Sequence, residues 1–174
     1  MDAETLRALQ APLKQKYRDD PQAGIVTLRA SARAGEGVSC KVETGRALVV
    51  AGLHPATGGD GALACSGDML LEALVACAGV TLRAVSTAIG VELRQATVSA
   101  EGDLDFRGTL GVSKEVPVGF RAIRLHFDVE SRSPREQIDK LLALTERYCV
   151  VYQTIRNGAP VATSIGVASS SPTT

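Results

Sequence analysis

Apolar residues recur along the chain with two periods, one typical of helices and one typical of strands. Residues 66–88 are apolar at almost every position and Gly90 is a typical helix-ending residue, so a long central helix is predicted there. Residues 133–147 open with Ser-Pro and a nearby glutamate, which predicts a second principal helix. A shorter helical segment is expected at 149–156, and leucines spaced by three and four residues predict an N-terminal helix over about residues 3–17.

Strict alternation of apolar and polar residues predicts the strands. It is clearest in the apolar set Ile123, Leu125, Phe127 and Val129, whose polar neighbours would face the other way. Turn-forming residues separate three β-rich runs near the N-terminus, which are expected to form a meander. The expected strands cover residues 24–33, 37–43, 46–52, 96–105, 123–130 and 161–167.

The order of these elements predicts the fold class. Strands grouped around two principal helices, without a regular β-α-β series, indicate an α+β fold with mainly antiparallel sheets. No repeat or linker divides the sequence, so residues 1–174 are expected to form a single domain. The Ser-, Pro- and Thr-rich end, about residues 168–174, is expected to be a disordered tail.

Composition narrows the partners. There are 19 Lys plus Arg, 19 Asp plus Glu, 3% aromatic residues and no Trp, so neither a positive field nor a base-stacking surface for nucleic acid is expected. Glu72 and Arg83 interrupt the longest apolar stretch, which favours a buried helix over a membrane span. Four cysteines without a secretion signal predict a reducing, cytoplasmic location.

The central helix has almost no polar side. At about 100° per residue, Leu70 and Cys77 share one stripe, while Leu71, Val75 and Ala78 fill another. A helix that is apolar nearly all round must be covered nearly all round. One modest sheet is too small for that, so we expect a second copy of the chain to complete the cover in a homodimer.

Cys77 and Cys149 are the candidate reactive residues. Cys77 lies in the apolar central helix, where a cysteine commonly acts as a small buried hydrophobe, and its surroundings alone favour that interpretation. Cys149 stands where one helix ends and another begins. A thiol at a helix N-terminus has its thiolate stabilised by unpaired N–H groups, but simple packing explains Cys149 equally well.

The other candidate groups carry less chemistry. Cys65 precedes the central helix and is a candidate third thiol, whereas Cys40 lies in an expected strand and receives no role. His54 and His126 have no ligand-like spacing, so no metal is expected. The loop 59–64 fits G-x-G-x-x-(G/A), but it lies outside a strand-to-helix turn and lacks the acidic residue that should follow, so a flexible loop is favoured and no cofactor is expected.

Two segments carry a resemblance to a known family. They read SGDMLLEALVAC at 66–77 and YCVVYQTI at 148–155, with EGDLDFRG at 101–108 between them. Together and in this order they resemble the OsmC/Ohr family of thiol peroxidases, in which a helix carries one cysteine and a later Cys-Pro-Val word carries a second. The resemblance covers roughly residues 24–165.

The resemblance implies a fold and a chemistry. The fold it implies is an intertwined α+β homodimer with active sites at the subunit interface. It also implies that Cys77 is the peroxidatic cysteine, which attacks a hydroperoxide and becomes a sulfenic acid, and that Cys149 is the resolving cysteine, which forms a Cys77–Cys149 disulfide. An organic hydroperoxide would be the substrate, a dithiol the reductant, and oxidative stress the setting.

The chain departs from the family pattern at the residues that ionise the attacking thiol. Peroxidase members carry a glutamate at the position of Gly67, paired with an arginine. Asp68 is the candidate replacement, although its side chain is shorter and on an ideal helix it points about 180° away from Cys77.

No motif places the arginine. The candidates for it are Arg29, Arg33 and Arg46. Val150 also replaces the proline that usually follows the second cysteine. These departures keep a second hypothesis open, a non-enzymatic small-molecule-binding or stress-related module on the same fold.

Overall fold

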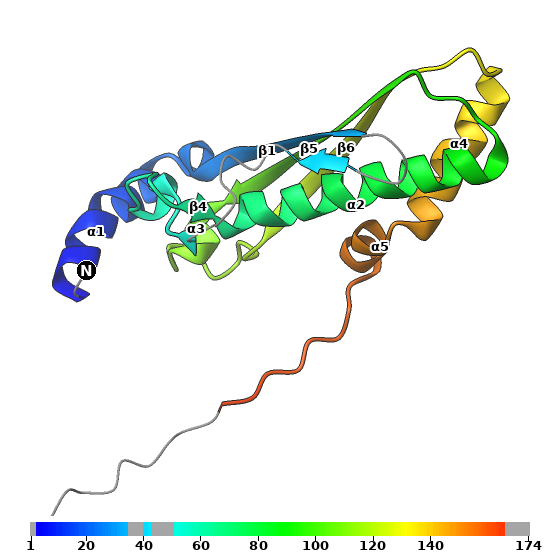
Figure 1. Cartoon of the computed structure of the whole chain (residues 1–174). Helices are drawn as coiled ribbons and strands as arrows, with labels where there is room; N and C mark the ends of the chain where they lie inside the picture. The colour runs from blue at the N-terminus through cyan, green and yellow to red at the C-terminus, as the bar shows by residue number, and fades with distance from the viewer. Residues whose placement is uncertain (1–2, 35–39, 43–50, 166–174) are drawn as a thin grey trace, which may run out of the picture.

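The long helix α2, Ser66–Ile89, is the axis of the fold, and a twisted sheet lies along one of its sides (Figure 1). The computed structural model describes residues 3–34, 40–42 and 51–165. The other helices are α1 (Ala3–Asp19), η1 (Pro21–Gly24), η2 (Pro55–Thr57), α3 (Phe106–Thr109), α4 (Arg135–Tyr148) and α5 (Val150–Asn157). The strands are β1 (Ile25–Ala34), β2 (Cys40–Val42), β3 (Ala51–Gly52), β4 (Ala64–Cys65), β5 (Gln95–Asp105) and β6 (Phe120–Glu130).

Both principal helices and the short helix after Cys149 are confirmed. Helix α2 ends at Gly90, whose φ of 71° lies in the left-handed region and whose N–H donates to the carbonyls of Ser86 and Thr87. Only glycine adopts that conformation without strain, so this residue stops the helix where the sequence predicted. Helix α4 starts slightly later than expected because Pro134 is its N-cap.

The main sheet is antiparallel throughout, in the order β2-β1-β5-β6. The predicted α+β class with mainly antiparallel sheet is therefore confirmed. Strand β5 alternates as expected, with Ala96, Val98 and Ala100 buried and Gln95 and Thr97 exposed. The buried side of the sheet faces α2, which fixes the face on which the candidate cysteines lie.

The expected meander is confirmed for its first two strands, whereas the described end of the expected third strand, Ala51–Gly52, pairs elsewhere. Strands β1 and β2 pair antiparallel, but β3 pairs in parallel with β4 in a separate two-stranded sheet. Strand propensity indicates an extended segment and does not specify its partner, which depends on how the chain returns. Here β4, the partner of β3, directly precedes α2. Residues 46–50, the rest of the expected third strand, lie outside the described residues.

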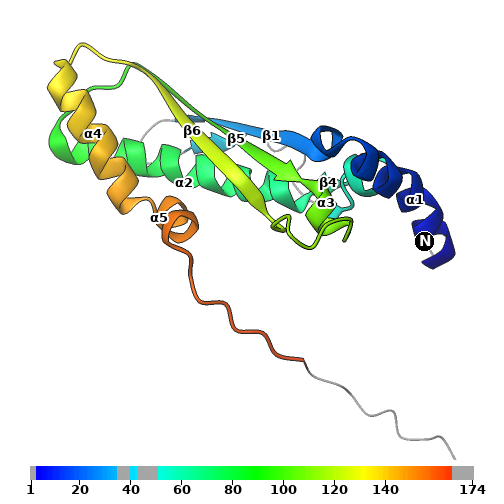
Figure 2. The same cartoon turned by 180° about the vertical axis from the view of Figure 1, so that it is seen from behind.

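The expected last strand is wrong over residues 161–165. These residues are exposed and have no strand pairing in the described chain. They form an arm that leads away from the body after α5 (Figures 1 and 2). A strand needs a hydrogen-bonded neighbour, and the arm pairs with none of the described strands. Residues 166–174, including the expected disordered tail, lie outside the described residues.

The main core lies between α2, the sheet and α4. Leu71, Val75, Ala78 and Leu82 form the buried stripe of α2. From the facing elements, the same cluster includes buried residues of β5 and of α4, together with Cys149. A smaller cluster of Tyr17, Phe106 and Leu110 joins α1 to α3, at the end of α2 opposite α4 (Figure 1).

Helix α2 is left partly uncovered by its own chain. Among the described helices it is the one long and apolar enough to cross a membrane by length and composition, with a mean hydropathy of 1.6. The core helix of a globular protein has the same properties, and the buried stripe of α2 against the sheet is packing of that kind. However, only 39% of its most apolar window is buried, so the chain leaves apolar helix surface for something else to cover.

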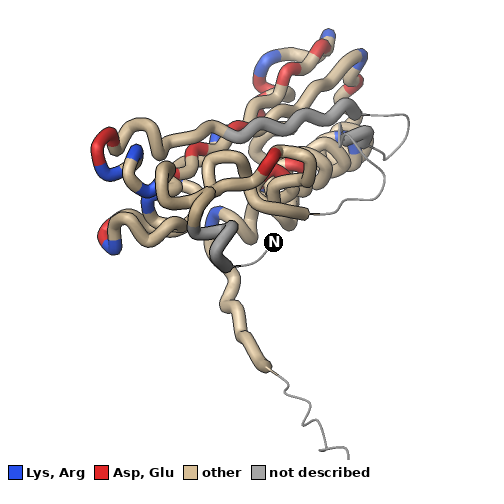
Figure 3. The backbone as a smooth tube through the Cα atoms, turned by 90° about the vertical axis from the view of Figure 1, so that its left-hand side faces the viewer, with Lys and Arg blue, Asp and Glu red and all other residues tan. Residues whose placement is uncertain are grey.

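Charged residues of both signs are interspersed over the described chain (Figure 3). On the polar face of the sheet Arg124 donates to Asp103 at 2.6 and 3.0 Å, and Thr27 donates to the same carboxylate at 2.7 Å. The Arg124 hydrogen bonds lower the pKa of Asp103 to about 2. Pairing of this kind neutralises charge locally and creates no single-sign surface.

Candidate active site

Cys77 of α2 and Cys149, which joins α4 to α5, pack together in the main core cluster. Cys77 lies in the middle of α2 and is partly buried, whereas Cys149 is only 1% exposed. Cys149 joins two helices, because its N–H donates to the carbonyl of Thr145 (2.9 Å) and its own carbonyl accepts from the N–H of Gln153 (2.9 Å). Hydrogen bonding between the two thiols is a cause of opposite pKa shifts, lowering the pKa of Cys77 and raising that of Cys149. The residues that the resemblance paired are thus neighbours in space.

Hydrogen bonds converge on the sulfur of Cys77. Burial raises the pKa of this thiol, but four donors act against burial and outweigh it, so the pKa of Cys77 is lowered. The donors, in order of their effect, are the Val151 N–H, the Cys149 thiol, the Thr81 hydroxyl and the Val150 N–H. A donor favours the charged form of the group that it contacts, so this site stabilises a Cys77 thiolate without a charged partner.

The pKa of Cys149 is shifted in the opposite direction. Burial is the main cause and raises it, and the neighbouring Cys77 raises it further, both by hydrogen bonding and by its charge. The N–H groups of Tyr152 and Val151 oppose the rise without cancelling it. Cys149 is therefore the protonated member of the pair when Cys77 is ionised. Cys149 lies just before the start of α5, as the sequence indicated, and N–H groups from the first turn of α5 act to lower the pKa of both thiols.

Thr81 is a site residue that sequence reasoning did not assign. It lies four residues after Cys77 on α2, and this spacing places the two side chains on the same side of the helix. That spacing was the available signal. Nothing in the sequence indicated that the hydroxyl turns toward the sulfur, because threonine in a helix can also bond to its own backbone.

Cys65 and Asp68 lie away from the cysteine pair. Cys65 is the N-cap of α2, about 18 Å from Cys77 along the helix axis at 1.5 Å per residue, and Asp68 is about 13.5 Å away. Burial raises the pKa of Asp68, and the positive charge of nearby His54 acts to lower it. His54 in turn stacks on Phe106 with ring centroids 5.0 Å apart. Asp68 thus belongs to a group of residues at the N-terminal end of α2.

The candidate arginines cannot be placed beside Cys77. The side chains of Arg29 and Arg33, all of Arg46 and the side chain of Cys40 lie outside the described residues. Within the described part of the chain, the groups that set the pKa of Cys77 are hydrogen-bond donors and burial, with no arginine or carboxylate among them. Over the same residues, no three His, Cys, Asp or Glu side chains gather in the way that a metal ion requires.

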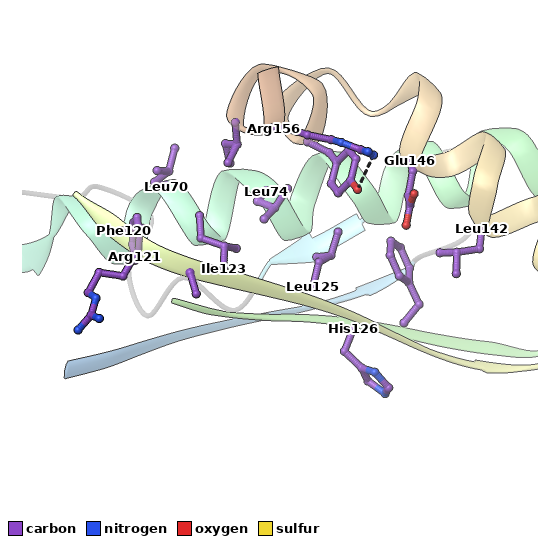
Figure 4. Close-up of a pocket in the computed structure, with 14 residues that line it drawn as sticks. Leu70, Leu74, Phe120, Arg121, Ile123, Leu125, His126, Leu142, Glu146 and Arg156 are labelled. Atoms are coloured by element: carbon purple, nitrogen blue, oxygen red, sulfur yellow. Dashed lines mark hydrogen bonds between the residues drawn. The ribbon is translucent and has the colours of Figure 1, made fainter. Parts of the chain in front are cut away.

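An apolar groove of about 920 Å³ runs between α2, β6, α4 and α5. Figure 4 shows Leu74 of α2 facing Ile123 and Leu125 of β6 across it, whereas His126 points away. Leu70 and Leu74 precede Cys77 on the same stripe of α2, so the groove follows the side of the helix that carries the cysteine. A groove of this size and lining suits an apolar small molecule or an apolar surface of another protein.

Charged and hydroxyl groups stand at the end of the groove formed by α4 and α5. Arg156 donates to the hydroxyl of Tyr152 at 3.3 Å, drawn as a dashed line in Figure 4, and Glu146 lies nearby on α4. A second apolar groove, of about 570 Å³, lies on the other side of the α2–α4 contact and includes Thr81 and Tyr148. The two grooves flank the part of α2 that holds Cys77.

Two neighbouring cysteines with opposite pKa shifts, on an α+β fold, define a candidate thiol-based site. The sequence model of the family described as OsmC-like protein matches residues 59–164, more than half of the chain, and that match includes both cysteines. The chain therefore belongs to the OsmC-like protein family. No curated protein sequence matches the chain at a significant level.

Solved structures agree with the fold. An OsmC-like hydroperoxide resistance protein from Jannaschia sp. CCS1 is similar to this chain with a TM-score of 0.62 and 13% identity, over 84% of this chain and 97% of that one. An OsmC-like protein from Mycoplasma pneumoniae is similar with a TM-score of 0.53 and 17% identity, over 77% and 86% of the two chains. At these identities the likeness concerns the fold alone.

Proposed function

We propose that this protein is a cysteine-dependent peroxidase that reduces organic hydroperoxides through Cys77 and Cys149. The observation that carries the proposal is the contact between the two thiols, with the pKa of Cys77 lowered and that of Cys149 raised. A two-cysteine peroxidase needs one thiol that ionises first and a second thiol within bonding reach. Membership of the OsmC-like family and the likeness to a hydroperoxide resistance protein support the substrate class.

The first step oxidises Cys77. Its thiolate attacks the outer oxygen of the hydroperoxide, so an S–O bond forms while the O–O bond breaks. The alkoxide leaves and takes a proton from water, giving an alcohol, and the Cys77 sulfur becomes a sulfenic acid. The hydrogen bonds to Cys77 lower its pKa and so increase the fraction of thiolate available for this attack.

The second step forms the disulfide. The sulfur of Cys149 loses its proton and attacks the sulfur of Cys77, so an S–S bond forms, the S–O bond breaks and hydroxide leaves to become water. The Cys77 thiolate contributes to the raised pKa of Cys149, and this contribution ends when Cys77 becomes a neutral sulfenic acid. Cys149 therefore ionises more easily after the first step than before it.

A dithiol closes the cycle by thiol–disulfide exchange. Its two thiols are oxidised to a disulfide while Cys77 and Cys149 return to their reduced forms. A reducing, cytoplasmic compartment would supply such a reductant. The apolar groove beside Leu70 and Leu74 would hold the organic part of the hydroperoxide.

We also propose that the working form is an intertwined homodimer. Support comes from the uncovered apolar surface of α2, from the two apolar grooves beside it and from the exposed arm after α5, which includes Val161 and Ile165. A second copy would cover these surfaces and would place the active sites at the subunit interface. Apolar surface of this extent is uncommon on a monomer.

The test is consumption of cumene hydroperoxide by the purified protein with a dithiol reductant. We expect turnover in the native protein, none in Cys77→Ser, and unchanged turnover in Cys65→Ser, which removes a thiol far from the pair. Turnover of Asp68→Asn tests whether the Asp68 carboxylate influences the reactivity of Cys77 from a distance. Robust turnover in Cys77→Ser would refute the assignment.

The second candidate function is a non-enzymatic small-molecule-binding module. The groove of about 920 Å³ favours it, together with a Cys77 environment that contains hydrogen-bond donors but no charged activating partner among the described residues. A Cys77 that alkylates with an ordinary or raised pKa, in a protein that binds apolar ligands, would support this alternative over the peroxidase.

A further inference from the structure

One corner of the large apolar groove lies close to both cysteines. The lining of this groove includes Leu74 of α2, three residues before Cys77, and Tyr152 of α5, three residues after Cys149. Three residues of helix span about 4.5 Å along the axis, so this corner lies about one helical turn from each cysteine. Tyr152 also packs against the same core cluster as Cys77. A ligand that fills the groove and reaches Cys77 therefore passes beside Tyr152.

The hydroxyl of Tyr152 is held in place by Arg156. The Arg156 guanidinium donates to the phenol oxygen at 3.3 Å and lies over the same ring, 5.9 Å from its centroid. Four residues separate the two on α5, a spacing that places them on one side of the helix. Within the described part of the chain the Tyr152 O–H donates to no acceptor, although its oxygen accepts from Arg156. The phenol proton is therefore available to a ligand in the groove.

We propose that the Tyr152 hydroxyl is the proton donor to the alkoxide that leaves when Cys77 attacks a hydroperoxide. This inference rests on the proposed function and adds a catalytic residue to it, with Tyr152 in place of water as the immediate source of the proton. As the S–O bond forms and the O–O bond breaks, the Tyr152 proton passes to the departing oxygen, which leaves as an alcohol. The remaining phenolate takes a proton from water, and the hydroxyl is restored.

The chemistry of the groove end favours Tyr152 for this role. A phenol is a stronger acid than an alcohol, so transfer of its proton to an alkoxide is favourable. The positive charge of Arg156 stabilises the phenolate that forms, because it lies against the same oxygen. Arg156 itself keeps its protons in proteins, and the ionised carboxylate of Glu146 accepts hydrogen bonds but has none to donate.

Tyr152→Phe isolates the hydroxyl. It removes one oxygen and its proton, while the ring that packs against the core and the backbone of α5 are retained. Tyr148→Phe is the matched control. Tyr148 lines the second groove and has Arg147 over its ring at 5.5 Å, so this variant removes a phenol hydroxyl beside an arginine at a different place.

The experiment measures the rate of Cys77 oxidation in full-length protein by two oxidants, followed by mass spectrometry. Cumene hydroperoxide releases an alkoxide that needs a proton, whereas 3-chloroperbenzoic acid releases a stable carboxylate that needs none. We expect Tyr152→Phe to react about 100-fold more slowly with cumene hydroperoxide and at the native rate with the peroxy acid. Tyr148→Phe should match the native protein with both. Equal losses with both oxidants, no loss with either, or an equal loss in Tyr148→Phe would overturn the proposal.

A second variant keeps the proposal falsifiable if Tyr152→Phe does not fold. Arg156 is exposed, and Arg156→Met removes the charge that stabilises the phenolate. We expect it to react about tenfold more slowly with cumene hydroperoxide and unchanged with the peroxy acid. Alkylation of Cys77 by iodoacetamide, which needs no proton donor, should proceed at the native rate in both variants. A loss of alkylation that matches the loss of oxidation would show that the variants act on the Cys77 thiolate, and would overturn the proposal.

Binding of the alcohol product separates this inference from the proposed function. 2-Phenyl-2-propanol, the alcohol formed from cumene hydroperoxide, should bind about fivefold more weakly to Tyr152→Phe than to the native protein in calorimetry, as loss of one hydrogen bond implies. That difference in a protein without turnover would refute the proposed function alone and retain Tyr152 as the donor to the ligand oxygen. Turnover of cumene hydroperoxide at the native rate in Tyr152→Phe would refute the role of Tyr152 alone.

Discussion

Cys149 donates the hydrogen bond by which it contacts Cys77, so the ionisation of each thiol depends on that of the other. The contact stabilises negative charge on Cys77 and disfavours it on Cys149. The two cysteines therefore have an order of ionisation that follows from the fold, with the α2 cysteine first. That order is the one that a nucleophilic thiol and a resolving thiol require.

The thiol contact predicts which disulfide forms. After one equivalent of cumene hydroperoxide, peptide mapping by mass spectrometry should find Cys77 joined to Cys149. A Cys65–Cys77 bridge is not expected, because about 18 Å of helix separates these residues and a disulfide spans no more than about 7 Å between Cα atoms. Oxidation of Cys77 to sulfonic acid without any bridge would contradict the resolving role of Cys149.

Replacing Thr81 with valine should raise the pKa of Cys77. Valine has nearly the same shape but no hydroxyl, so one donor to the sulfur is lost while the helix is retained. We expect the midpoint of the alkylation rate against pH to rise by about half a unit to one unit. Thr87→Val is the matched control, since Thr87 is exposed near the end of α2 and bonds to the carbonyl of Arg83 (2.9 Å). Equal shifts in both variants would contradict a specific role for Thr81.

Asp105→Asn should destabilise the fold in a pH-dependent way. The side chain of Asp105 is 1% exposed and accepts from Nε of Arg107 at 2.9 and 3.1 Å. Hydrogen bonding from Arg107 outweighs burial and lowers the pKa of Asp105, so its stabilising effect is complete above the unfolded pKa of about 3.9 and is lost as the pH falls through the folded pKa.

We therefore expect the variant to lose about 2–4 kcal/mol of unfolding free energy at pH 7. The difference in unfolding free energy between the variant and the native protein should shrink toward pH 3 and below. Urea denaturation at pH 7 and at pH 2 measures it. A difference of the same size at pH 7 and at pH 2 would show that Asp105 stabilises the fold by some means other than its charge.

Leu70→Lys should separate the proposed dimer without unfolding the chain. Leu70 is 40% exposed in the single chain and lines the large groove, so a lysine there would place a charge in an apolar interface. Sedimentation analysis should find the native protein dimeric and the variant monomeric, with unchanged circular dichroism. Ala143→Lys is the control, because Ala143 is exposed on α4 and lines neither groove. A native protein that sediments as a monomer would refute the dimer.

Local pattern was sufficient for the elements with a strong period. The run over residues 66–88 and the stop at Gly90 predicted α2 closely, and the alternation in β5 and β6 predicted which side chains face the core. These features depend on helix and strand geometry within one segment. The pairing of β3 with β4 and the unpaired state of residues 161–165 depend on neighbours from elsewhere in the chain, and no local pattern carried that information.

The candidate site divides in the same way. By itself the sequence determined that an apolar helix carries Cys77 and that Cys149 lies between two helices, and family resemblance suggested that the two belong together. Only the tertiary structure decided what surrounds the sulfur of Cys77: the thiol of Cys149, the hydroxyl of Thr81 and the first N–H groups of α5. Hydrogen-bond donors act through distance and direction, and folding alone sets both for segments that are far apart in the chain.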